Sequence, residues 1–271
     1  MRALSTSKAA DPLLLGEELS RKRLGETVLA RLSRAILDGR LKPGDPLPAE
    51  GQIAATFGVS KQIAREAMRE LVTMGVVHIQ QGKISRVRAI DGEPLARFFR
   101  FAVGASESGI VEAVELRRML EPPIARLAAQ RRTKEDLVVL DTLLAQMADA
   151  AGDNARWVEA DLGFHEHIAR MTKNRLIALQ MAGLAPVVRD VMQRFNARNS
   201  KNPRDWDGPL QRHARVADAL RAGDADQAML AMTAHFAFAD QAIEEIYREQ
   251  QNANGTRPDK KRPRPRSGRT P

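Results

Sequence analysis

The chain has 271 residues, a formal net charge of +9 and a sequence pI of about 10.3, and 43% of its residues are hydrophobic. This length suits two domains with real cores, and the basic balance favours a polyanionic partner. The absence of cysteine excludes disulfide scaffolds, thiolate metal sites and cysteine nucleophiles, and no apolar run approaches a membrane span, so we expect a cytoplasmic protein.

The first expected helix runs from Leu24 to Leu37, because Val28, Leu32 and Ile36 recur on one side at helical spacing. Residues 1–23 before it are expected to form a flexible N-terminal segment. The sequence DGRLKPG that follows Leu37 contains two glycines and a proline and ends the helix.

Residues 53–69, IAATFGVSKQIAREAMR, predict two short helices that are joined by a tight turn at Gly58, with Ser60 capping the second helix. Three basic side chains follow at i, i+4 and i+8 and therefore line one face of that helix: Lys61, Arg65 and Arg69. Such a helix fits the major groove of B-DNA. A solvated charged face is the simpler alternative, because two glutamates on the same helix partly offset the positive charge.

The residues after this helix predict a small hairpin. Residues 74–79 stop the helix and run into a strand, residues 80–83 form a turn, and Ile84 to Val87 return as a second strand. A helix-turn-helix followed at once by a hairpin is a winged helix. At its tip, Gly82 allows close approach to the sugar-phosphate backbone, and Lys83 lies beside it.

The segments ILDGRLKPGDPLPAE and VSKQIAREAMRELVTMGVV resemble the winged-helix domain of GntR-type bacterial transcription regulators over residues 24–90. The resemblance implies operator binding by a homodimer, with Lys61 and Arg65 where the family contacts bases and phosphates. Gly51 stands where many members place a basic residue, and Gln62 begins a stretch that replaces the usual Thr-Pro-Val. Because Gln62 lies at the N-terminus of the recognition helix, the operator sequence of relatives does not transfer to this chain.

The remainder of the chain is expected to be all helical. Residues 91–94 read as a linker, residues 95–248 as an antiparallel helical bundle, and residues 249–271 as a basic disordered tail, which is more readily explained as solubilising than as DNA-binding. The expected bundle helices are Leu95–Val103, Gly109–Arg131, a helix that Thr133 caps and that ends at about Ala150, Asn154–Thr172, Asn174 to about Asn199, about Pro209 to Ala222, and a last helix from Asp224 or Ala225 to Arg248. The fold class is therefore mainly α, with a winged helix-turn-helix before an all-α bundle.

Three of the five histidines fall on different helices of this bundle, at His165, His213 and His235. Asp161 precedes His165 by one helical turn, so both side chains share a face. One imidazole from each of two other helices would complete a site of one carboxylate and three imidazoles, which suits Zn²⁺, Ni²⁺ or Mn²⁺. Spacing alone leaves this open, since each histidine can equally be a surface or hydrogen-bonded core residue.

The bundle also resembles a known domain. ELRRMLEPPIARLAA from Glu115, DLGFHEHIA from Asp161, a helical His213 and AMTAHF from Ala231 resemble the FCD ligand-binding domain, which accompanies one branch of GntR-type regulators. The resemblance implies a metal, most readily Zn²⁺, held by Asp161, His165, His213 and His235. It also implies a small organic-acid effector, for which the guanidinium of Arg117 is the candidate carboxylate partner.

Several residues have simpler interpretations. Arg117 can instead pair with Glu121 or Glu115 on its own helix. His167 faces away from His165 and is expected at the surface or beside the site. His78 is expected to be structural in the wing, and the two tryptophans, Trp157 and Trp206, are expected to close edges of the core.

The leading hypothesis is a DNA-binding transcriptional regulator, most often a repressor among relatives, which binds a pseudo-palindromic operator as a homodimer and responds to a small organic acid. Two alternatives belong to other classes. A metal-dependent hydrolase with an accessory DNA-binding domain is conceivable, although the chain has no HExxH or GxSxG motif. An architectural DNA-binding protein without an effector would use the bundle only to dimerise.

Overall fold

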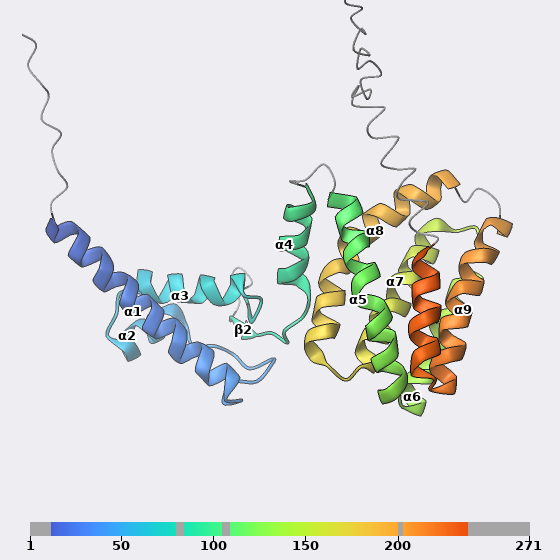
Figure 1. Cartoon of the computed structure of the whole chain (residues 1–271). Coiled ribbons are helices and arrows are strands. Elements are labelled where there is room, and N and C mark those ends of the chain that lie inside the picture. The colour runs from blue at the N-terminus through green and yellow to red at the C-terminus, as the bar shows by residue number, and fades with distance from the viewer. Residues whose placement is uncertain (1–11, 80–83, 105–108, 200–202, 238–271) are drawn as a thin grey trace, which may run out of the picture. The chain divides into compact units, whose positions relative to one another are not determined.

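A computed structural model describes residues 12–79, 84–104, 109–199 and 203–237. The chain divides into two compact units, Met1–Pro94 and Leu95–Pro271. Both units are built mainly of helices, and the described strands form one small antiparallel pair (Figure 1).

The N-terminal unit contains α1 (Pro12–Leu37), α2 (Glu50–Phe57) and α3 (Lys61–Thr73). Helix α1 begins earlier than predicted, because residues 12–23, which we expected to be flexible, form its first turns. Helices α1 and α2 both pack on α3. The shared core consists of apolar side chains from all three helices, the hairpin and the segment between α1 and α2: Val28, Leu32, Leu47, Ile53, Ala54, Ile63, Ala64, Ala67, Met68, Leu71, Val77 and Val87.

The wing is a short antiparallel ladder of β1 (Val77–His78) and β2 (Arg86–Val87), in which Val77 pairs with Val87 and His78 with Arg86. Val77 and Val87 point into the core, whereas His78 and Arg86 are exposed, as the period-two alternation of a half-buried strand requires. His78 lies on a strand of the wing, as the sequence predicts. The tip, which includes the predicted DNA contacts Gly82 and Lys83, lies outside the described residues.

The C-terminal unit is a helical bundle. Its helices are α4 (Glu93–Gly104), α5 (Gly109–Arg131), α6 (Lys134–Asp149), α7 (Asn154–Met171), α8 (Arg175–Asn199), a 3₁₀ turn η1 (Pro203–Trp206), α9 (Asp207–Ala222) and a last helix over residues 225–237. Helix α4 begins inside the predicted linker, where Asp91 accepts a hydrogen bond from the backbone N–H of Glu93 at 3.1 Å. Residues 238–248 of the predicted last helix lie outside the described residues.

Helix α7 lies at the centre of the bundle and packs against α5, α6 and α8, while α9 packs against α5 and α6. Large apolar side chains occur along the whole length of α7, and three of them are almost fully buried: Trp157, Phe164 and Ile168. Polar side chains on such a helix are forced into the core, where they need partners. Asp161 and His165 are two such buried polar residues of α7.

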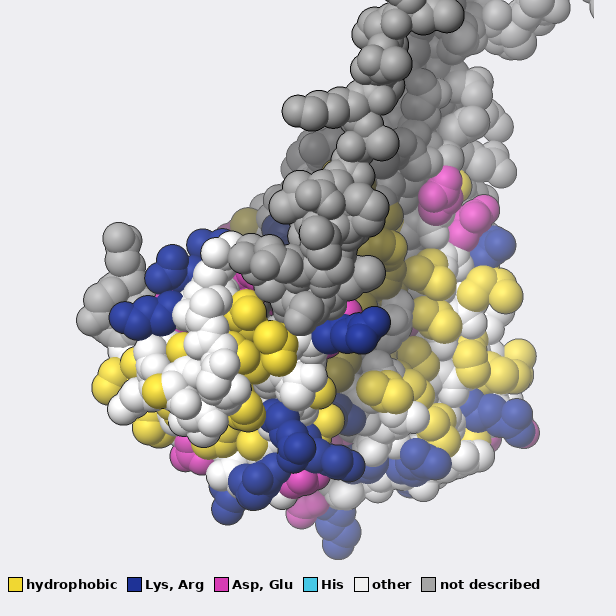
Figure 2. All heavy atoms as spheres, turned by 90° about the vertical axis from the view of Figure 1, so that its left-hand side faces the viewer, with side chains coloured by type: hydrophobic (Ala, Val, Ile, Leu, Met, Phe, Trp, Pro, Cys, Tyr) yellow, Lys and Arg dark blue, Asp and Glu magenta, His cyan; other side chains and the backbone are white. Residues whose placement is uncertain are grey.

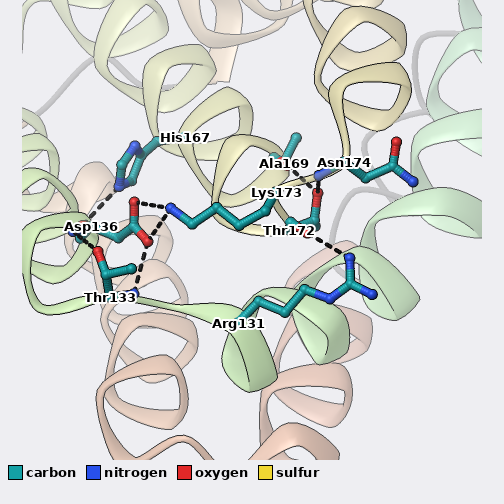
Figure 3. A network of polar contacts seen from close by, with 8 residues as sticks. All are labelled: Arg131, Thr133, Asp136, His167, Ala169, Thr172, Lys173 and Asn174. Atoms are coloured by element: carbon teal, nitrogen blue, oxygen red, sulfur yellow. Dashed lines mark hydrogen bonds and ion pairs between the residues drawn. The ribbon is translucent and has the colours of Figure 1, made fainter.

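Polar contacts fasten one end of the bundle, where α5, α6 and α7 meet (Figure 3). Asp136 accepts the backbone N–H of Thr133 at 2.8 Å and two bonds from the Lys173 ammonium at 2.6 and 2.8 Å. The Arg131 guanidinium donates to the Thr172 carbonyl at 2.9 Å. Thr133 and Asp136 form a capping box at the start of α6, and the contact from Lys173, just after α7, extends it.

Within the described ranges, no helix combines the length and the apolar character that crossing a bilayer requires.

Candidate DNA-reading helix and metal centre

Helix α3 forms as its sequence predicts. The Ser60 side chain accepts the backbone N–H of Ile63 at 3.3 Å, and Gly58 ends α2 in the left-handed conformation with a φ of 63°. Pairs of buried apolar residues then alternate with pairs of exposed polar ones along α3. The exposed set contains the four predicted DNA contacts of this helix: Lys61, Gln62, Arg65 and Arg69.

Contacts within the unit orient these exposed side chains. The Nε of Arg65 donates to Glu50 at 2.9 Å, so this contact uses neither of the two terminal nitrogens of the guanidinium. Gln62 donates to Glu66 at 3.2 Å. A Cβ built on Gly51 would lie 3.4 Å from the Cε of Lys61, so the Lys61 side chain lies over Gly51.

Lys and Arg side chains cover more of the face drawn in Figure 2 than Asp and Glu side chains do. Exposed guanidinium and ammonium groups in such a surface attract the phosphates of a duplex from any sequence. The exposed face of α3 is suited to DNA, because its basic side chains can contact phosphates and the same polar face can reach base edges.

The second candidate site lies inside the bundle. Helix α7 supplies Asp161 and His165, α9 supplies His213, and the helix over residues 225–237 supplies His235. One ligand atom of each histidine lies within 4.8 Å of those of the other two. The Asp161 carboxylate approaches Nε2 of His213 at 2.9 Å and Nε2 of His165 at 3.9 Å. The structure thus brings together all four residues predicted to bind a metal.

Hydrogen bonds on the far side of two rings define which nitrogen faces the centre. Nδ1 of His165 contacts the Glu121 carboxylate, and Nδ1 of His213 contacts the Pro209 carbonyl at 2.9 Å. Because a carboxylate and a carbonyl can only accept, each Nδ1 carries the proton. The Nε2 atoms of both rings face the Asp161 carboxylate, and a neutral ring with this tautomer has its lone pair on Nε2.

Four buried atoms of the cluster have no hydrogen-bond partner within the described part of the chain: Asp161 Oδ2, His165 Nε2, His213 Nε2 and His235 Nδ1. Oδ1 of Asp161 lies 2.9 Å from Nε2 of His213, but within the described residues this close contact is not a hydrogen bond. Burying a polar atom without a partner costs free energy. A divalent cation bound among these four atoms would give each of them a partner. One carboxylate and three imidazoles form a donor set that Zn²⁺ accepts.

Electrostatics favour this reading of the cluster. Burial alone would raise the pKa of Asp161, but His165, His213 and Arg117 outweigh it, so its pKa is lowered and it stays a carboxylate. Burial, together with His213 and His165, holds the pKa of His235 well below its ordinary value. Both groups are therefore in the protonation state that a metal ligand needs at neutral pH.

Arg117 of α5 lies beside this cluster and is 5% exposed. Its Nε donates to Glu121, so the simpler interpretation of Arg117, an ion pair on its own helix, describes the structure. Its Nη2 atom is buried without a hydrogen-bond partner among the described residues. Arg117 and His165 also line a cavity of about 10 Å³, which has room for about one water molecule.

Glu121 is the residue of the site whose role the sequence interpretation missed. We had considered it only as a partner of Arg117, whereas it also holds His165, which is 44 residues away. Arg117 and His165 outweigh the effect of burial and lower the pKa of Glu121, so it is ionised. Spacing along one helix carried no signal for this second contact.

Three other predicted side chains have clear positions. His167 is 5% exposed, so its predicted place at the surface is wrong, although it does face away from the cluster, where its Nε2 contacts the Asp136 carbonyl at 2.8 Å. Trp157 and Trp206 are buried against each other with ring centroids 4.7 Å apart. They belong to the core itself.

Comparisons with known proteins agree with both units. Residues 24–87 match the family model of bacterial regulatory proteins of the gntR family, and residues 112–238 match that of the FCD domain. The chain is 27% identical to the HTH-type transcriptional regulator LutR of Bacillus subtilis over 220 residues, which cover 79% of this chain and 98% of LutR.

Two further relatives are the galactonate operon transcriptional repressor of Escherichia coli and the HTH-type transcriptional repressor NanR of the same species. The first is 26% identical over 82% of this chain and 97% of its own length, and the second is 29% identical over 85% and 88%.

Among solved structures, a GntR protein of Streptococcus agalactiae matches with a TM-score of 0.57 and 25% identity, over 83% of this chain and 99% of that protein. The matched families and relatives are transcriptional regulators, so the hydrolase hypothesis is not supported and the protein is not an enzyme. The two matches in chain order, winged helix first and FCD domain second, show that this chain belongs to the GntR family of bacterial DNA-binding transcription regulators.

Proposed function

We propose that this protein is a homodimeric repressor that binds a pseudo-palindromic operator through α3 and the wing and is released by a small organic acid. The acid would bind at a divalent metal held by Asp161, His165, His213 and His235. The observation that carries this proposal is the convergence of four buried, unpartnered ligand atoms at one point of the bundle. Two relatives are named as repressors, one of them of a galactonate operon, and galactonate is itself a carboxylate.

Charge accounting supports a carboxylate as the effector group. Among the described buried groups that carry a charge, Arg117 contributes one positive charge, and Glu121 and Asp161 contribute one negative charge each. A divalent cation would bring the site to a net charge of about +1. Since uncompensated charge in an interior is costly, one carboxylate would complete the balance, and the buried Nη2 of Arg117 would donate to it.

The small size of the cavity suggests how binding reaches the DNA. The space beside Arg117 and His165 holds about one water, and its other walls include Leu184, Ala185 and Val188 of α8. An organic acid can enter only if α8 moves relative to α5 and α7. We propose that this movement shifts the population of dimers whose two α3 helices fit the operator, by a coupling free energy of about 1 to 3 kcal/mol.

The metal would act as a Lewis acid that holds the acid group, with Zn²⁺ as the first candidate and Ni²⁺ or Mn²⁺ as others. The test is elemental analysis of the purified full-length protein, together with thermal unfolding of metal-loaded and chelated samples in the presence of small organic acids. About one metal per chain and stabilisation by an acid only in the loaded sample would support the proposal. Substoichiometric metal and no stabilisation by any acid would favour the architectural DNA-binding alternative.

A further inference from the structure

Glu121 occupies the space between the candidate metal centre and Arg117. It is 2% exposed, and each of its carboxylate oxygens has one partner. Oε1 accepts from Nε of Arg117, which is one helical turn away on α5, and Oε2 accepts from Nδ1 of His165 on α7. The carboxylate therefore links two helices and two different kinds of group.

Each contact has a chemical consequence for His165. An ionised carboxylate can only accept, so Nδ1 of His165 carries a proton, and in the neutral ring the lone pair is then on Nε2. The Arg117 guanidinium compensates the buried negative charge, so Glu121 does not need a proton from His165 to remain in the core. Nε2 of His165 is the atom that faces Asp161 and the other two histidines.

We propose that Glu121 is the positioning residue of the metal centre: it holds His165 in the Nδ1–H tautomer and in the orientation that presents Nε2 to the cation. This inference rests on the metal site proposed above. It adds α5 to the helices that build the site, through a residue that is not itself a ligand. Outer hydrogen bonds of this kind typically account for about 10- to 100-fold in metal affinity.

A simple removal of Glu121 would leave Arg117 buried and unpaired, which would mix charge burial with the effect on the metal. Two double variants avoid this problem. Arg117→Met/Glu121→Gln removes both charges and keeps an amide oxygen that can accept the Nδ1 proton, whereas Arg117→Met/Glu121→Met removes the acceptor as well. Their side chains are similar in size, so the pair isolates the hydrogen bond to His165.

The measurement is Zn²⁺ affinity of the full-length variants by competition with a chelating indicator, followed by the visible spectrum of the Co²⁺-loaded proteins. We expect the Met/Met variant to bind Zn²⁺ about 10- to 100-fold more weakly than the Met/Gln variant and to show an altered Co²⁺ spectrum. Equal affinities and identical spectra would overturn the proposal. Glu115→Ala, an exposed site on the same helix, is the control and should leave both readouts at the wild-type value.

The wild-type protein separates this inference from the proposed function. If the wild type takes up no Zn²⁺, the metal site and the role of Glu121 both fail. If it binds Zn²⁺ and the two double variants match each other, only the role of Glu121 fails.

A second measurement needs no variant of Glu121 to fold. Nitrogen-15 NMR of the imidazole rings in chelated wild-type protein, with the His165 signals assigned by their loss in His165→Gln, reports the tautomer directly. Protonated Nδ1 with a bare Nε2 is expected for His165. The opposite tautomer would overturn the proposal.

Discussion

Helix α3 and the centre of the bundle use charged side chains in opposite ways. On α3, Lys61, Arg65 and Arg69 are exposed, and the ion pair of Arg65 with Glu50 lies in contact with solvent. In the bundle, Arg117, Glu121 and Asp161 are at most 5% exposed and satisfy one another or point at a common centre. Water screens the charges on α3. In the bundle the dielectric is low, so each ion pair or hydrogen bond is stronger and each buried polar group without a partner costs more free energy.

Because of this difference, the charged side chains of α3 mainly affect DNA affinity, whereas those of the bundle mainly affect the stability of the fold. An exposed side chain of α3 can be replaced with little effect on stability, because surface ion pairs contribute only about 0–1 kcal/mol, and its loss is felt when DNA is bound. A buried member of the bundle cluster cannot be removed alone without stranding its partner. Substitutions in the two regions should therefore change different measured quantities.

The largest effect is expected for Arg117→Ala. The substitution leaves the Glu121 carboxylate buried with one partner removed, and breaking a buried pair in this way costs about 3 to 5 kcal/mol. Urea unfolding of chelated full-length protein measures the loss. A loss of stability below about 1 kcal/mol would mean that the buried Arg117–Glu121 pair contributes no more than an exposed ion pair. The proposed difference between the two regions would then be wrong.

His213→Ala should abolish stoichiometric metal, because it removes one of the converging ligand atoms. We expect Zn²⁺ affinity to fall by more than the roughly 100-fold upper range of an outer-shell loss, and the thermal response to organic acids to disappear. Operator binding without effector should stay at the wild-type level. His167→Gln is the matched control, since His167 faces away from the cluster, and stoichiometric metal in His213→Ala would show that the ligand set is wrong.

Arg65→Ala should weaken specific operator binding by about 1 to 3 kcal/mol and leave the urea midpoint unchanged. Its guanidinium is exposed and oriented by Glu50, so the loss is confined to the DNA contact. Titration of an operator fragment at fixed salt measures it. Arg126→Ala removes an exposed arginine of the other unit and controls for the loss of one positive charge. An equal loss of operator affinity in both variants would mean that Arg65 on α3 makes no specific contact with the operator.

Asp136→Asn should change the free energy of unfolding least, and the size of this change should depend on pH. Burial would raise the pKa of Asp136, but the Lys173 ammonium and the Thr133 N–H outweigh it and lower the pKa below the ordinary carboxyl value (Figure 3). A lowered carboxyl pKa stabilises the fold above the unfolded pKa, and this contribution is lost as the pH falls through the folded value.

Wild type and Asp136→Asn should therefore differ by about 0.5 to 1 kcal/mol at neutral pH and converge below about pH 4. Thermal unfolding as a function of pH measures the difference. A gap that persists undiminished at low pH would mean that the charge of Asp136 does not contribute.

Local patterns predicted much of the fold. The bounds of α5 and the Thr133 cap of α6 agree with the sequence prediction, because caps, glycines and apolar periodicity act within one or two turns. The start of α1 was missed, since residues 12–23 lack an apolar stripe strong enough to distinguish a helix from a flexible segment. The start of α4 was missed because Glu93-Pro94 also reads as a linker, and a proline is tolerated in a first helical turn.

The sequence by itself determined the winged helix, the helical second domain and four candidate metal ligands, because helix signals are local and the family motifs are contiguous. Only the tertiary structure decided that Glu121 joins Arg117 to His165, that His167 is buried, and that four ligand atoms converge without hydrogen bonds. These facts depend on which faces of distant helices pack together. Such packing is a property of the whole core and leaves no periodic trace in any one segment.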